Sequence, residues 1–107
     1  MITVKVRRTE GRVASFEASG HAGSAQYGRD IVCAAVSAVT LTAVEGLRKV
    51  AGLAPRVVQN DDAGFLSVDL GRDATDASAQ IILATMLTGL TAIAHDNPRY
   101  VKIEDID

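Results

Sequence analysis

The first twenty residues alternate between apolar and polar side chains, which is the pattern of half-buried β-strands. In residues 2–8 every second side chain is apolar, so one face of a strand would be buried and the other exposed. The alternation returns in residues 13–19, and its apolar face holds Ala14, Phe16 and Ala18. Glu10 and Gly11 separate the two runs and supply a turn, so this part of the chain predicts a β-hairpin.

Two later segments are long, apolar and rich in Ala and Leu, which predicts helices. The first follows Asp30, a residue type that often caps a helix, and spans residues 31–50. The second opens at residues 74–76 and ends near His95, before an Asn-Pro pair that cannot continue a helix. Shorter alternating runs predict three further strands at residues 56–59, 65–70 and 100–105.

The elements follow one another in the order ββαββαβ. This order predicts an α+β fold with two layers, a mixed sheet of about five strands and two buried helices. Residues 31–44 contain no ionisable group except Cys33, and residues 77–94 contain none. A helix without a polar face is buried on more than one side. Because so small a sheet cannot cover both helices, we expect a homodimer packed through helical faces rich in Ala, Thr and Val.

Length and composition indicate one domain over residues 1–107, with the 48% hydrophobic and 22% charged residues of a soluble globular protein. We expect no segment long and apolar enough to span a membrane, and we expect that the charged N-terminus is not a signal peptide. We therefore expect a cytoplasmic protein that does not bind membranes. The net charge of −2 argues against direct nucleic-acid binding. Acidic residues gather in the second half, where they suit either a basic protein partner or solvated turns.

The candidate chemistry is limited to Cys33, His21 and His95, the only sulfhydryl and imidazole groups of the chain. One cysteine cannot form an internal disulfide. A zinc site needs three or four ligands, and neither a C-x-x-C nor an H-x-x-x-H spacing occurs, so we expect no metal and no cofactor. His95, at the end of the second predicted helix, fits a helix-terminal surface residue.

Cys33 can be a small core residue or a nucleophile. The core is the usual place for a lone cysteine among alanines. However, with Asp30 as N-cap, Cys33 is the third helical residue, close to the positive end of the helix dipole, which favours the thiolate. His21 lies in a glycine-flanked loop that can fold back to the helix start. An imidazole beside a thiolate is the usual pair for nucleophilic attack on a carbonyl.

Neighbouring residues can complete such a site. The backbone N–H of Cys33 and an adjacent N–H can hold an oxyanion. Asp30 can orient His21 or only cap the helix, and Ser37 can contribute a hydrogen bond near the site or only bond back to its own helix. The substrate loop would contain Gly20, Gly23, Tyr27 and Gly28. If this loop closes only over substrate, Cys33 and His21 can stand far apart in the free protein.

The stretch GHAGSAQYGRDIVCAAVS at residues 20–37 resembles the signature of the ribosomal-processing cysteine protease (Prp) family of bacteria. The similarity continues in MLTGLTAIA at residues 86–94 and PRYVKI at residues 98–103. The resemblance implies that Cys33 is the nucleophile and His21 its partner, with Asp30 and Ser37 in supporting positions. It also implies a homodimer with a mobile loop over the site, at residues 20–29. Ser24 stands where many members have a larger side chain, so preference near the cut can differ.

By resemblance, the chain is a cysteine endopeptidase. It would remove a short N-terminal extension from the large-subunit ribosomal protein numbered twenty-seven during ribosome assembly. Two other classes of function stay open from the residues alone. The protein can be a non-catalytic ribosome-assembly or protein-binding factor, which would keep its binding without Cys33 and His21. It can also be a thiol redox sensor, which would oxidise reversibly at Cys33.

Overall fold

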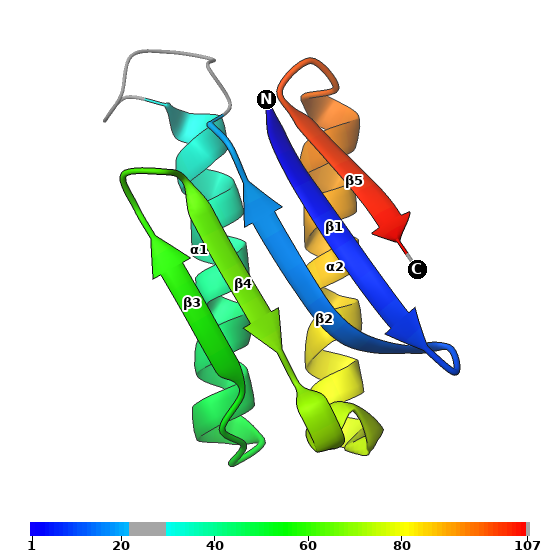
Figure 1. Cartoon of the computed structure of the whole chain (residues 1–107). Helices are drawn as coiled ribbons and strands as arrows, with labels where there is room; N and C mark the ends of the chain where they lie inside the picture. The colour runs from blue at the N-terminus through cyan, green and yellow to red at the C-terminus, as the bar shows by residue number, and fades with distance from the viewer. Residues whose placement is uncertain (22–29, 107) are drawn as a thin grey trace.

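The structure is a computed structural model that describes residues 1–21 and 30–106. Its five strands form one sheet in the order β3-β4-β2-β1-β5 (Figure 1). Strand β5 runs parallel to β1, and the other neighbouring strands are antiparallel, so the sheet is mixed. The strands span Ile2–Thr9 (β1), Arg12–Ser19 (β2), Arg56–Asn60 (β3), Phe65–Asp69 (β4) and Val101–Ile106 (β5).

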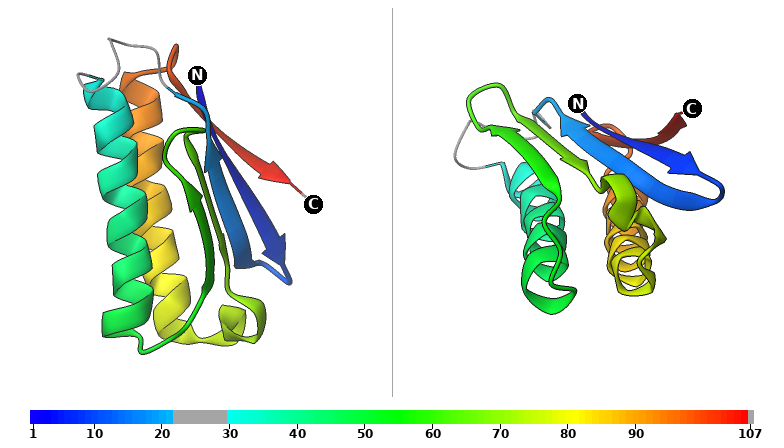
Figure 2. Two further views of the ribbon diagram at one scale, coloured as in Figure 1. Left: turned by 60° about the vertical axis from the view of Figure 1, so that its left-hand side comes forward. Right: turned by 60° about the horizontal axis from the view of Figure 1, so that its bottom comes forward.

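Two long helices cover one face of this sheet, which gives the molecule two layers (Figure 2). Helix α1 spans Ile31–Glu45 and continues as a π-helical turn over Gly46–Val50, and α2 spans Ala77–Asp96. The core lies between the layers and includes Val4, Val6, Phe16, Leu47, Val68, Leu83 and Leu90. The predicted α+β fold with a mixed five-stranded sheet is therefore confirmed.

The hairpin of β1 and β2 contains a β-bulge that the alternating pattern did not predict. A two-residue turn at positions 10–11 joins the strands, with the positive φ angles of 53° and 78° that a type I′ turn requires. Further along, the pairing shifts between Arg7 and Arg8, so Ala14 is an extra residue in β2. The expected burial of Ala14 is wrong, because Val13 takes the core position with 3% exposure and Ala14 is only partly buried.

Gln80 on α2 holds this bulge in place. Its Oε1 accepts a hydrogen bond from the Val13 N–H at 2.9 Å, and its Nε2 donates to the Val13 carbonyl at 2.9 Å and to the Ala74 carbonyl at 2.8 Å. A bulge interrupts the regular ladder of a sheet, and buried backbone groups need partners. The side-chain amide of Gln80 supplies them, which fixes the start of α2 relative to β2.

Both helices begin at aspartate caps. Asp30 Oδ1 accepts the Cys33 N–H at 3.0 Å, and Asp76 Oδ1 accepts the Ala79 N–H at 2.9 Å. A short 3₁₀ helix over Gly71–Thr75 precedes the second cap. Helix α2 therefore starts slightly later than the apolar pattern suggested, because the residues before Asp76 already belong to another turn.

Each helix buries the side that meets the sheet and exposes the opposite side in the single chain. Ile31 on α1 is 79% exposed and Ile81 on α2 is 68% exposed. By length and composition alone, the helical segments Ile31–Val50 and Ala77–Asp96 are sufficient to cross a membrane. This corrects our expectation that no segment reaches that length and hydropathy, although both helices pack on the sheet here.

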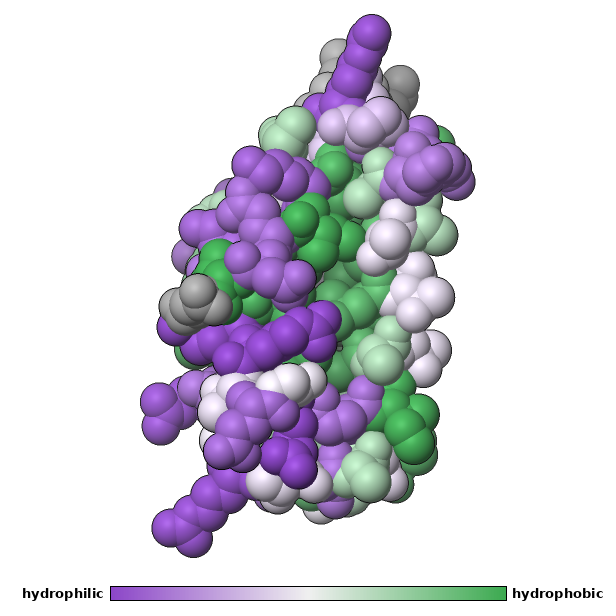
Figure 3. Space-filling model, turned by 90° about the vertical axis from the view of Figure 1, so that its right-hand side faces the viewer, coloured by the Kyte–Doolittle hydropathy of each residue, from purple (hydrophilic) through white to green (hydrophobic). Residues whose placement is uncertain are grey.

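The edge of the molecule at β5 and α2 shows a strip of apolar surface between the two layers (Figure 3). Hydrophilic surface over the outer face of the sheet lies on one side of this strip. Val101 and Ile103 from β5 and Ala94 from α2 line a cavity at this edge. The hydrophobic core therefore reaches the surface at the β5 edge.

Candidate active site

Cys33 lies in the first turn of α1, as the sequence predicts, and its thiol is half-buried. The carboxylate of Asp30 accepts the Cys33 N–H, and the Asp30 carbonyl accepts the Ala34 N–H at 3.0 Å. The predicted cap is thus confirmed. The Cys33 N–H is engaged by this cap, so the expectation that it holds an oxyanion does not describe this structure.

His21 lies two residues beyond the end of β2, and hydrogen bonds hold its carbonyl and the neighbouring Gly20 in place. The Met1 nitrogen donates to the His21 carbonyl at 2.7 Å, and the Gly20 N–H donates to the Gly64 carbonyl at 2.8 Å. Gly20 has a φ of +94°, where a side chain is strained, and a Cβ there would collide with the Met1 carbonyl oxygen. These constraints aim the exposed imidazole of His21 toward the start of α1.

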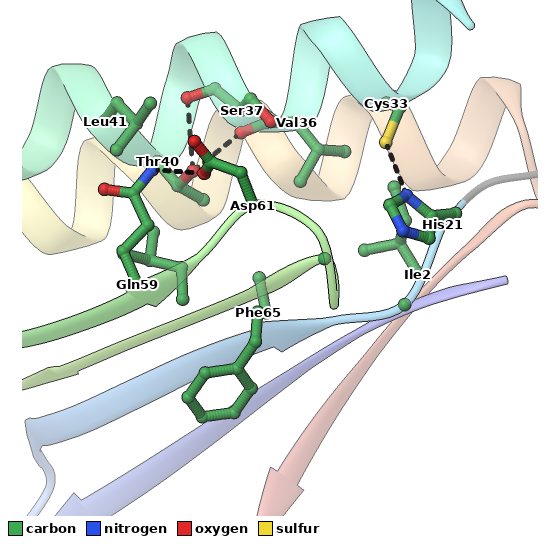
Figure 4. A pocket seen from close by; sticks show the side chains of 14 residues that line it. Ile2, His21, Cys33, Val36, Ser37, Thr40, Leu41, Gln59, Asp61 and Phe65 are labelled. Carbon is green, nitrogen blue, oxygen red and sulfur yellow. Dashed lines mark hydrogen bonds between the residues drawn. The ribbon is translucent and has the colours of Figure 1, made fainter. Parts of the chain in front are cut away.

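The two candidate catalytic side chains face each other across the mouth of a cleft (Figure 4). The Sγ of Cys33 lies 4.0 Å from the Nδ1 of His21. This distance is at the upper limit for a hydrogen bond to sulfur, so a small movement brings the pair into close contact. The wide separation considered for the free protein is not what the structure has.

The cleft continues from Cys33 along α1 and has a volume of about 270 Å³. One wall is α1, and the opposite wall is the end of the β3–β4 hairpin. The helix contributes Cys33, Val36, Ser37, Thr40 and Leu41, and the hairpin contributes Gln59, Asp61, Gly64, Phe65 and Leu66. The sequence predicted strands at residues 56–59 and 65–70, but it did not predict this wall, because no local pattern places residues 59–66 beside α1.

Polar groups line the cleft beyond the cysteine. Gln59 Nε2 donates to Asp61 Oδ1 at 2.9 Å, which orients a carboxylate on the hairpin wall. Thr40, 2% exposed, donates its hydroxyl hydrogen to the Val36 carbonyl at 2.9 Å, with the Ser37 carbonyl also in range at 3.2 Å. The cleft therefore combines apolar surface with a carboxylate.

Ser37 lies one turn beyond Cys33 and lines the same cleft. Several threonines of the two helices bond back to carbonyls of their own helix, such as Thr42 to Ala38 at 2.6 Å. In the described part of the chain the Ser37 hydroxyl makes no such bond. Within the described residues Ser37 thus lies at the cleft without a hydrogen bond from its hydroxyl to its own helix, and a hydrogen bond from that hydroxyl to a bound ligand stays a prediction.

The remaining candidates lie elsewhere or outside the described residues. His95 is exposed in the last turn of α2, with Nδ1 at 3.4 Å from Asp96 Oδ1, as expected of a helix-terminal surface residue. Of the predicted substrate loop, Gly20 is described, and Gly23, Tyr27 and Gly28 fall outside the described residues, as does Ser24. Within residues 1–21 and 30–106, no group of three His, Cys, Asp or Glu side chains is placed to hold a metal ion.

Comparison with known proteins identifies the family. The family model described as cysteine protease Prp matches residues 1–102. The chain belongs to the Prp cysteine protease family. A curated relative, the ribosomal processing cysteine protease Prp of Bacillus subtilis (strain 168), is 39% identical over 66 residues. That stretch covers 61% of this chain and 59% of the relative, so the alignment spans about three fifths of the relative's length.

Solved Prp structures share the whole fold. The crystal structure of an essential ribosomal processing protease Prp from S. aureus with a covalently linked product peptide has a TM-score of 0.94 and 31% identity. A structure of the S. aureus protease with a substrate peptide has a TM-score of 0.89 and 30% identity. Both alignments cover 99% of this chain and 100% of the other. The family resemblance found in the sequence is thus confirmed. Both of these similar structures contain a bound peptide.

Proposed function

We propose that this chain is a cysteine endopeptidase of ribosomal protein processing, with Cys33 as nucleophile and His21 as its acid–base partner. The observation that carries the proposal is the 4.0 Å approach of Sγ and Nδ1 at the mouth of a cleft. The substrate we propose is the large-subunit ribosomal protein numbered twenty-seven, carrying a short N-terminal extension that is removed during ribosome assembly. The names of the relatives, which are ribosomal processing proteases, support a ribosomal substrate, and the choice of the protein numbered twenty-seven rests on the family resemblance of the sequence.

The reaction begins with proton transfer from Cys33 to His21, which gives a thiolate beside an imidazolium. The thiolate attacks the carbonyl carbon of the scissile bond and forms a C–S bond. The imidazolium then protonates the leaving amine as the C–N bond breaks, and a thioester remains on Cys33. Water, deprotonated by His21, attacks the thioester, and the C–S bond breaks to release the acid and restore the thiolate–imidazolium pair.

The oxyanion formed in each step needs hydrogen-bond donors. The first N–H groups of a helix have no acceptor within the helix. Because Asp30 takes the Cys33 N–H, we assign the oxyanion to the two preceding N–H groups, those of Ile31 and Val32. Asp30 then serves the site by fixing the first turn of α1, on which the sulfur is carried.

The homodimer expected from the sequence is also part of this proposal. Its support is the outer side of the two helices, which is exposed in the single chain and carries Ile31 and Ile81. Light scattering at micromolar concentration should give the mass of two chains, and Ile81→Glu should give one. Val58→Glu, at an exposed position on strand β3 and away from the helices, tests whether any added charge has this effect. A wild-type protein that is only monomeric refutes the dimer.

We place the protein in the cytoplasm, where ribosomes assemble and where a free thiol such as Cys33 stays reduced. Fractionation of host cells with an antibody to the chain tests this placement. Recovery in the membrane pellet after a high-salt wash would contradict this placement and would indicate that the two apolar helices insert into a membrane.

The decisive experiment uses a peptide copied from the start of the host's own ribosomal protein, spanning the junction of its extension. Wild-type protein should cut it at one bond, and mass spectrometry of the fragments identifies that bond. Cys33→Ala should lower cleavage to background, and His21→Ala should lower kcat/KM by about a thousandfold or more. Cys33→Ala that cleaves like the wild type refutes the mechanism.

The same variants separate the other two classes of function. Binding of the intact ribosomal protein without any cleavage, unchanged in Cys33→Ala, indicates an assembly or binding factor. A reversible Cys33–Cys33 disulfide that changes activity or binding indicates a redox sensor.

A further inference from the structure

The turn between β3 and β4 lies directly behind the imidazole of His21. Gly64 in this turn has a φ of +62°. A Cβ on Gly64 would lie 2.9 Å from both Cε1 and Nε2 of His21 and 2.7 Å from the Gly20 carbonyl oxygen. These distances are well inside normal van der Waals contact, which is about 3.5 Å or more. The imidazole therefore occupies space that exists because residue 64 has no side chain.

We propose that Gly64 is a positioning residue for the catalytic histidine, an inference that rests on the proposed function. His21 is held between two elements, because its Nδ1 side faces the sulfur of Cys33 and its Cε1–Nε2 side faces Gly64. The backbone of Gly64 thus sets how far the ring stands from α1 and at which angle Nδ1 meets the sulfur.

The backbone behind the ring cannot retreat easily. The Gly64 carbonyl accepts the Gly20 N–H at 2.8 Å, and the next residue, Phe65, pairs with Ser19 in the sheet. The Gly64 N–H also donates to the Asp61 carbonyl at 3.2 Å within the turn. Since the turn is tied to β2, the strand that precedes His21, a methyl group on residue 64 presses on the Gly20 carbonyl and pushes the imidazole of His21 out of its place.

Gly64→Ala tests this role, and the chain offers matched controls. Gly71 and Gly52 have φ angles of +57° and +71°, so alanine there meets the same backbone strain. A Cβ at either control position has nothing within 4 Å. Any effect of Gly64→Ala beyond that of Gly71→Ala therefore reports the contact with His21 and Gly20 rather than the positive φ.

The first measurement is the rate at which iodoacetamide alkylates Cys33 across pH, which needs no substrate. We expect Gly64→Ala to slow alkylation near neutral pH and to give the pH profile of His21→Ala, whereas Gly71→Ala keeps the wild-type profile. With the peptide substrate, kcat/KM should fall about tenfold or more for Gly64→Ala, since small misplacements of catalytic groups are costly. Gly71→Ala should stay within about twofold.

A double-mutant cycle then shows whether the effect passes through the ring. In a His21→Ala background, Gly64→Ala should change alkylation less than twofold. If Gly64→Ala alone folds poorly, His21→Ala should restore part of its melting temperature, because two of the three close contacts are to the imidazole.

The proposal is overturned if Gly64→Ala matches Gly71→Ala in alkylation and kcat/KM. It is equally overturned if Gly64→Ala slows both backgrounds by the same factor, or if a poorly folded Gly64→Ala protein regains none of its melting temperature when His21 is also replaced by alanine. A wild-type protein that cuts no peptide, but shows the expected alkylation pattern, would refute the proposed substrate and leave the role of Gly64 standing.

Discussion

Asp30 poses a question that substitutions can answer, because its carboxylate can act on the helix or on the histidine. In the structure its Oδ1 accepts the Cys33 N–H at 3.0 Å, as a helix cap does. Asp76 performs the same task for Ala79 at 2.9 Å, at the start of the other helix. Asp76→Ala is therefore a matched control that removes a cap without touching the site.

The magnitude follows from the cap. Replacing an aspartate cap by alanine costs about 1 kcal/mol of folding free energy, while asparagine caps nearly as well as aspartate. An unfolding entropy of about 2.1 cal/mol/K per residue gives roughly 0.22 kcal/mol/K for 107 residues. Asp30→Ala and Asp76→Ala should each lower the melting temperature by about 4–5 °C at equal protein concentration, and Asp30→Asn by about 1–2 °C.

Activity separates the two roles. If Asp30 acts by holding the first turn of α1, Asp30→Ala should lower kcat/KM about tenfold, Asp30→Asn less than about threefold, and Asp76→Ala less than about twofold. The measurements are a thermal melt followed by circular dichroism and peptide cleavage well below the melting temperature. Asp30→Asn that is as inactive as Asp30→Ala would refute the reasoning, since the charge and not the cap would then matter.

Three further outcomes are expected. Gln80→Ala should lower the free energy of unfolding by about 1–3 kcal/mol, because the N–H and the carbonyl of Val13 both lose their hydrogen-bond partner. Urea unfolding measures this loss, and a value below about 0.5 kcal/mol would contradict the role given to Gln80. Thr40→Ser should lower the free energy of unfolding by about 1 kcal/mol, because it removes a buried methyl group. Thr40→Val should be nearly neutral, because the carbonyls that accept the Thr40 hydroxyl still accept hydrogen bonds within the helix. The reverse order would contradict this assignment. A hydrogen bond from Lys102, together with the charge of Lys102, lowers the pKa of Glu104. This exposed pair therefore stabilises the fold at pH values above the ordinary glutamate pKa, and the stabilisation is lost as the pH falls through the lowered pKa. Lys102→Met should raise the pKa of Glu104 in an NMR titration, and an unchanged titration would show that the pair does not form in solution.

The sequence predicted the helices and strands because the apolar residues of each element repeat with a single spacing, which differs between a helix and a strand. The strand of Ile2, Val4 and Val6 and the helix of Leu83, Met86 and Leu90 bury the faces that the pattern indicates. The bulge at Ala14 was missed, because one inserted residue looks the same as continued alternation until the partner strand is known. The sequence did indicate the bulge, because Val13 and Phe16 are three residues apart and can face the same side of a strand only if one residue is inserted between them.

The candidate site was predictable on one wall only. Asp30 and Cys33 are neighbours in the chain, and the capping rule alone predicts their contact. The second wall, from Gln59 to Phe65, depends on β4 pairing with β2, a long-range arrangement that no local pattern contains. Gly64 looked like an ordinary turn glycine, and its closeness to His21 appears only when the sheet order is known.

Met1 and the start of β5 lie side by side, next to the backbone of His21. The Ile2 N–H donates to the Tyr100 carbonyl at 2.8 Å where β1 meets β5, and the adjoining Met1 nitrogen holds the His21 carbonyl. Protein synthesis runs from the N-terminus, so β1, β2 and α1 leave the ribosome long before β5. A nascent chain that already contains Cys33 and His21 still lacks the strand that pairs beside Met1, and the histidine gains this support only after β5 has been synthesised.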